Sequence, residues 1–143
     1  MFDDGVQDYV LNRLITGLSS SRAAARVGFS CALVHCLQKY PKRWKCDDLW
    51  KLCEDKLPLN DKDQSQANAI GRYLLLDSLF ASEVYKNNFK WIAEKQLALA
   101  ARFQWLSMGV WQSKTNSVNV THLIEVLISS ADKTNQFAEV VLF

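Results

Sequence analysis

Glycine and proline are scarce in this chain of 143 residues, which contains five glycines and two prolines. Sheets with tight hairpins usually need more of both, because glycine supplies positive φ angles and proline presets a turn. The shortage therefore favours an all-α fold. The shares of hydrophobic residues, 49%, and of charged residues, 22%, are typical of a globular domain with a real core.

The chain also lacks long apolar runs, a strong net charge and CxxC pairs. No stretch approaches the roughly 18 uninterrupted apolar residues of a membrane helix, so no membrane span is expected. The formal net charge of +2 is too small to argue for nucleic-acid binding from the overall field. Because the acidic start shows no secretory signal, the four cysteines are expected to be free thiols in an intracellular compartment.

Apolar residues recur at helical spacing in the first part of the chain. Residues 9–38 predict two amphipathic helices joined by a serine-rich corner, which together form an αα-hairpin. Gly17 is expected to close the first helix in a left-handed conformation. The serines at 19–21 are expected to cap the second helix, which should start near Arg22. Gly28 costs about 1 kcal/mol inside a helix, so it predicts a close approach by a neighbouring helix.

Further helices are predicted after this hairpin. Their expected ranges are 49–57, 65–82, 84–101 and 120–131, with 103–111 either continuing the fifth helix or forming a short one, and an apolar tail at 137–143. Successive short-linked helix pairs favour an armadillo- or HEAT-like helical-repeat solenoid, in a single α-helical domain over residues 1–143. Because no internal repeat recurs at a fixed period, a compact helical bundle is the alternative.

Residues suited to catalysis or metal binding do not form a recognisable motif. Cys31 and His35 share a helix face with Cys36 beside them, but no CxxC knuckle accompanies them, and a thiol on an apolar face is normally inert. Paired carboxylates fall at predicted helix starts or in the polar loop at 59–66, where capping and solvation explain them. We expect no catalytic residue, no metal, no cofactor and no small-molecule substrate. A cysteine- or metal-dependent enzyme is the least favoured interpretation.

The connector at residues 39–45, KYPKRWK, has four cations among seven residues. Its cations could pair with phosphates while Tyr40 and Trp44 stack on bases. The alternative is a solvated corner whose aromatic rings fold back onto the core. Arg22 and Arg26 share a helix face, so each is expected to have an acidic partner or ligand. The candidate contacts for nucleic acid or a protein partner are Arg13, Arg22, Arg26, Lys39, Lys42, Arg43 and Lys45.

Two blocks of the sequence carry a family resemblance. An R-L-x-x-G-L turn begins at Arg13, and S-S-R-x-x-A-R-x-G-F-S-x-A-L begins at Ser20. The segment IGRYLLL at 70–76 is a weaker match to F-G-R-L-F-G-L. These blocks resemble the Myb-binding protein 1A family, also called the DNA polymerase phi family. The resemblance covers about residues 9–111 and is strongest in the opening hairpin.

The resemblance implies both a fold and a function. The implied fold is a long armadillo-like solenoid, of which this chain would be an N-terminal fragment or a short form. The implied function is a non-catalytic scaffold of a nucleolar factor in rRNA gene transcription regulation and ribosome biogenesis. Its partners would be transcription factors or other nucleolar proteins in the nucleus and nucleolus. The alternative is a direct rDNA- or rRNA-binding module that uses the 39–45 connector.

Overall fold

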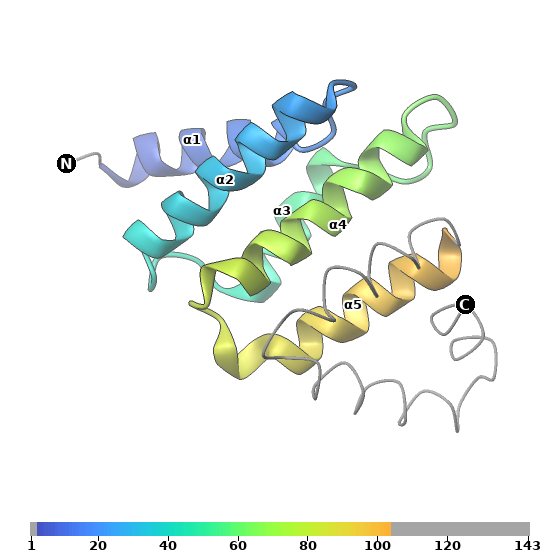
Figure 1. Cartoon of the computed structure of the whole chain (residues 1–143). Coiled ribbons are helices and arrows are strands. Elements are labelled where there is room, and N and C mark those ends of the chain that lie inside the picture. The colour runs from blue at the N-terminus through green and yellow to red at the C-terminus, as the bar shows by residue number, and fades with distance from the viewer. Residues whose placement is uncertain (1–2, 104–143) are drawn as a thin grey trace. The chain divides into compact units, whose positions relative to one another are not determined.

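A computed structural model describes residues 3–103, which form helices joined by short loops (Figure 1). The helices are α1 (Asp4–Gly17), α2 (Ala23–Lys39), α3 (Cys46–Lys56), α4 (Ser65–Ser82), the short 3₁₀ helix η1 (Lys86–Asn88) and α5 (Phe89–Arg102). No strand occurs in this part of the chain, and the predicted all-α fold class is confirmed. The predicted elements at 103–111, 120–131 and 137–143 extend into or lie in residues 104–143, outside the described ones.

The chain groups into two compact units. Residues 1–85 form the first unit, which contains α1 to α4, and the second unit begins at Lys86 and includes η1 and α5. A single domain over the whole chain and a solenoid arrangement both stay predictions. Over residues 3–103, none of the helices combines the length and apolarity that crossing a bilayer requires.

The first unit consists of two stacked helical hairpins (Figure 1). Along the chain, α1 pairs with α2 and α3 pairs with α4, while α2 also packs along α4 and α1 contacts α3. Apolar side chains at helical spacing make these contacts, because each helix buries one stripe against its neighbours. The fully buried side chains include Ile15 in α1, Leu18 at the C-terminal end of α1, and Leu33 and Leu37 in α2.

The most extensively buried helix of this unit is α4. Ten of its 18 residues are buried, which agrees with the sequence prediction that this helix is central in the packing. Its polar residues form hydrogen bonds to α2. The Ser78 hydroxyl lies 2.9 Å from the Ser30 hydroxyl, and Gln38 Nε2 donates to the Ser82 carbonyl at 3.3 Å. These bonds fix the register of α2 on α4.

The corner between α1 and α2 differs from the prediction in its use of Gly17. No described glycine has a positive φ angle, so the expected left-handed closure is wrong. Gly17 is instead the last residue of α1, and a Cβ there would lie 2.5 Å from ring atoms of Phe29. The residue must be glycine because an aromatic ring occupies the space that a side chain would need.

The corner serines also do not cap α2 as predicted. The N-cap of α2 is Arg22, which makes no side-chain capping bond. The Ser19 hydroxyl donates back to the Thr16 carbonyl at 3.0 Å, at the end of α1. The Ser20 carbonyl accepts a bond of 2.9 Å from Arg26 Nη1. The serine corner therefore closes the first helix, and Arg26 reaches back from the second helix to hold it.

The close helix approach that was predicted at Gly28 is found at Gly71 instead. A Cβ at Gly28 would meet no heavy atom within 4 Å, so Gly28 faces open space. A Cβ at Gly71 would lie 2.8 Å from Leu57 Cδ1 and 3.3 Å from backbone atoms of Leu18 and Ser19. Gly71 therefore lets α4 approach the α1–α2 corner.

Replacing the two glycines of the hairpin by alanine should change stability in opposite directions. Gly17→Ala forces the Phe29 ring to move, and such overpacking typically costs about 1–3 kcal/mol. Gly28→Ala meets no neighbour, so it should raise the unfolding free energy by about 0.5–1 kcal/mol through helix propensity. Urea unfolding of both variants measures the difference. Equal effects would contradict the close contact between Gly17 and Phe29.

Candidate functional site

The connector between α2 and α3 is held against α1 by Asp8. Arg43 Nη2 donates to both carboxylate oxygens of Asp8, at 3.1 and 3.0 Å, and Trp44 Nε1 donates to Oδ1 at 3.0 Å. Arg43 Nε also lies 3.7 Å from Asp4 Oδ1. One carboxylate on α1 therefore binds two residues of the connector, because an ionised carboxylate can accept several hydrogen bonds.

The connector's aromatic rings fold back onto the protein. Trp44 is only 9% exposed, and the Tyr40 ring meets it edge-on at 6.2 Å between centroids. The Tyr85 hydroxyl donates to the Trp44 carbonyl at 3.0 Å. The arrangement matches the alternative of a folded-back corner, and Trp44 presents no free face on which a base could stack.

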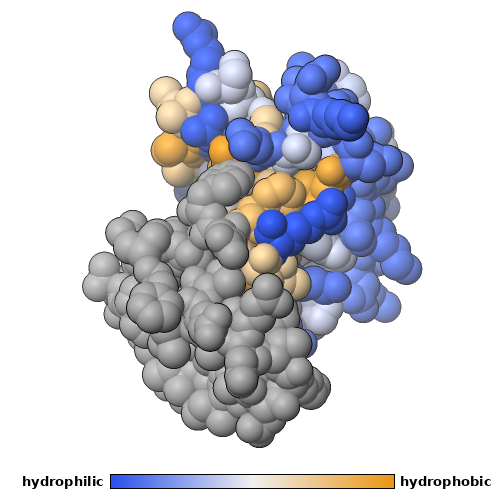
Figure 2. Space-filling view, turned by 90° about the vertical axis from the view of Figure 1, so that its right-hand side faces the viewer, coloured by the Kyte–Doolittle hydropathy of each residue, from blue (hydrophilic) through white to orange (hydrophobic). Residues whose placement is uncertain are grey.

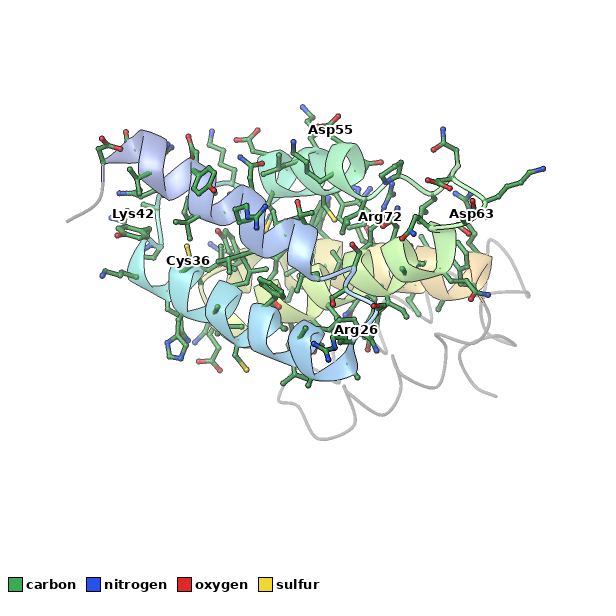
Figure 3. The ribbon with its side chains drawn as sticks, turned by 90° about the horizontal axis from the view of Figure 1, so that it is seen from above. Arg26, Cys36, Lys42, Asp55, Asp63 and Arg72 are labelled. Carbon is green, nitrogen blue, oxygen red and sulfur yellow. The ribbon has the colours of Figure 1, made fainter. Side chains whose placement is uncertain are left out.

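The predicted basic residues do not form one patch. Arg43 is bonded to Asp8, and Arg26 to the Ser20 carbonyl. The exposed ones, for which the described residues offer no ion pair, are Arg13, Arg22, Lys39, Lys42 and Lys45. Arg22 precedes α2 whereas the three lysines end it or follow it, so about 25 Å of helix separates the two groups. Figure 3 shows Arg26 and Lys42 at opposite ends of α2.

A groove between α1 and α2 was not found by sequence reasoning. Its volume is about 250 Å³, and α1 contributes Gln7, Val10 and Leu14 to its lining. The remaining lining residues come from α2 and the residue that follows it: Ala32, His35, Cys36, Lys39 and Tyr40. Figure 3 shows Cys36 between the two helices. We call this feature the α1–α2 groove.

The solvent-facing side of α2 beside this groove carries no charged residue over four turns. The exposed residues between Ala23 and Gln38 are Ala23, Ala24, Val27, Gly28, Cys31, Ala32, His35 and Gln38. Val27 is 63% exposed, and Tyr9 on α1 is 66% exposed. Figure 2, which shows the side of the molecule at the right of Figure 1, also has apolar residues at the surface among polar ones. Because a surface helix normally places charged residues toward water, this uncharged face of α2 is suited to a partner.

The four cysteines are free, and burial disfavours the thiolate in three of them. Burial raises the pKa of Cys46 and of Cys53 to about 12, with the charge of Asp47 adding to the effect at Cys46. Burial also raises the pKa of Cys36, against the opposing effect of Lys39. Cys31 and His35 are both exposed on the uncharged face. Within residues 3–103, no three His, Cys, Asp or Glu side chains lie together as metal ligands would.

Comparison with known proteins gives one family. The family model described as DNA polymerase phi matches residues 9–139, which is most of the chain and includes both sequence blocks that carry the resemblance. Neither the search of curated proteins nor the search of solved structures gave a match.

Removing the Asp8 carboxylate should destabilise the first unit. Asp8→Ala leaves the buried Trp44 N–H without its acceptor, so we expect the unfolding free energy to fall by about 1–3 kcal/mol. Asp8→Asn keeps an acceptor for Trp44 and loses only a half-exposed ion pair, so its effect should be smaller. Chemical denaturation compares the variants. If Asp8→Asn costs as much as Asp8→Ala, the ion pair and not the indole bond holds the connector.

Stability should fall at high pH because two buried thiols keep their protons in the folded state. Cys46 and Cys53 have folded pKa values of about 12, whereas unfolded thiols ionise near 9. The folded state then binds more protons than the unfolded state between these values. The contribution of these two thiols to the unfolding free energy should therefore be constant below about pH 8 and decline between about pH 9 and 12, by at most about 1.4 kcal/mol per pH unit for each thiol.

The same measurement on a Cys46→Ala/Cys53→Ala variant serves as the control. Its absolute stability will differ, but its decline between about pH 9 and 12 should be shallower, because the two titrating groups are gone. An identical slope in both proteins would contradict the assignment of the effect to these thiols.

Proposed function

Because the chain belongs to the DNA polymerase phi family, we propose that it is a non-catalytic helical scaffold of a nucleolar factor. It acts in rRNA gene transcription regulation and in ribosome biogenesis by binding transcription factors or other nucleolar proteins. Family membership supports the nuclear location of this activity. The observation that carries the scaffold role is the uncharged face of α2, which leaves apolar surface open to water.

A protein partner fits this surface on physical grounds. Exposed apolar area such as that of Val27 favours association, because its burial removes apolar surface from water. The helix beneath is rigidly held through Leu33 and Leu37, which are fully buried. A rigid apolar surface loses little conformational entropy when a partner binds, so more of the contact energy appears as affinity.

A scaffold role agrees better than catalysis with the chemistry of the described residues. Burial keeps Cys46 and Cys53 protonated at neutral pH, and a protonated thiol is a poor nucleophile. Several carboxylates have structural partners: Asp3 accepts from the Val6 N–H to cap α1, and Asp61 accepts from the Asp63 N–H. These side chains stabilise helix ends and turns.

Direct binding of rDNA or rRNA is the second candidate. The exposed cations Lys39, Lys42 and Lys45 favour it, because they lack carboxylate partners among the described residues and can pair with phosphates. Since Trp44 is buried and Arg43 is bonded to Asp8, the lysines would contact the phosphates of the nucleic acid without recognising its base sequence.

Complementation in cells separates the two candidates. Cells depleted of the protein should show altered synthesis of precursor rRNA, which the wild-type protein should restore. A Val27→Glu/Cys31→Glu variant places charges on the uncharged face without touching the core. We expect it to restore at most about half of the precursor rRNA synthesis that the wild-type protein restores. A Lys45→Ser variant, which leaves Lys39 and Lys42 beside the groove in place, should restore it fully. Metabolic labelling of precursor rRNA is the measurement.

The reverse result would favour the second candidate. If the lysine variant fails while the charged-face variant restores synthesis, the protein acts through nucleic acid. If depletion leaves precursor rRNA synthesis unchanged, the proposed role in rRNA gene transcription is wrong. Normal circular dichroism spectra of both variants are required before either outcome is interpreted.

A further inference from the structure

We propose that the α1–α2 groove binds an acidic amphipathic helix of a partner protein. This inference rests on the proposed scaffold function and names the chemistry of its partner. Two observations carry it: the apolar lining of the groove and the cations at one end.

The groove has the form that receives a helix. Val10 and Leu14 are one turn apart on α1, and Ala32 and Cys36 are one turn apart on α2, so two apolar walls run side by side. Gly28 precedes Ala32 by one turn and has open space where a Cβ would stand. A helix laid along α2 therefore meets no bulky side chain there, and its apolar stripe can enter the groove as in other helix-in-groove complexes.

The cationic end of the groove determines the charge of the occupant. Lys39 lines the groove, and the exposed Lys42 follows it in the connector. Carboxylates also lie at this end of α1, but they have partners. Asp3 caps α1, whereas Asp4 and Asp8 pair with Arg43. The two lysines lack carboxylate partners among the described residues, so a helix with acidic residues beside its apolar stripe is complementary to them.

Two synthetic peptides test the charge of the occupant against the full-length chain. Both have about 16 residues, with leucine at i, i+3, i+4 and i+7, so that each helix is about as long as α2. The remaining positions are glutamate in one peptide and lysine in the other, and both carry a fluorescent label. Fluorescence anisotropy should show binding of the glutamate peptide and at least tenfold weaker binding of the lysine peptide.

Variants of the chain locate the binding site. Ala32→Trp fills the groove from an exposed position and should weaken the glutamate peptide at least tenfold. Lys39→Glu/Lys42→Glu should weaken the glutamate peptide and strengthen the lysine peptide. The matched control Lys51→Glu/Lys56→Glu makes the same charge change on α3 and should leave both affinities unchanged. Gly28→Leu should also weaken binding, and circular dichroism checks that each variant is folded.

Several outcomes would overturn the inference. Equal affinity for both peptides would remove the charge argument, and binding that Ala32→Trp leaves unchanged would place the site elsewhere. Displacement of the glutamate peptide by a short RNA duplex would assign the groove's cationic end to nucleic acid. If neither peptide binds while the Val27→Glu/Cys31→Glu variant still fails in cells, the groove inference falls and the proposed function stands. If the glutamate peptide binds but depletion leaves precursor rRNA synthesis unchanged, the groove inference stands and the proposed function falls.

Discussion

The ring of Phe29 occupies the space beside Gly17, and this contact sets how closely α2 can lie against α1. At the same corner, Gly71 lets α4 reach the backbone of Leu18 and Ser19. Packed interiors tolerate little change in volume. The lack of a side chain at Gly17 and at Gly71 therefore fixes the positions of α1, α2 and α4 relative to one another. The separation of α1 and α2 that results leaves the α1–α2 groove open between Leu14 and Cys36.

The other end of the hairpin is fixed by polar bonds to the Asp8 carboxylate. It binds Arg43 and the Trp44 indole, which draws the connector onto α1. This use of one arginine has a consequence for the surface. The neighbouring cations Lys39 and Lys42 are left facing solvent beside the groove, while the connector's arginine stabilises the fold. The same seven-residue segment therefore supplies both a structural clamp and an exposed charge.

Helical periodicity predicted where helices occur, because an apolar stripe at 3.6-residue spacing is a local property. The expected range 65–82 matches α4. Gly17 and Gly28 were misassigned, because glycine serves either backbone freedom or close contact, and only the position of Phe29 distinguishes them. The groove was missed because periodicity shows that Val10 is apolar and does not show whether another helix covers it. The bond between Arg43 and Asp8 spans 35 positions, beyond any local pattern.

The distribution of charge favours a protein partner over nucleic acid. Exposed cations farther apart than about a Debye length, which is about 8 Å at physiological salt, reinforce one another's field only weakly. The exposed cations at Arg22 and at Lys39–Lys45 are separated by the length of α2, about 25 Å, so they do not form one shared field. The uncharged face of α2 is continuous over that same distance. Burial of apolar area does not depend on a shared field, and this continuous surface is therefore the basis of the proposed protein partner.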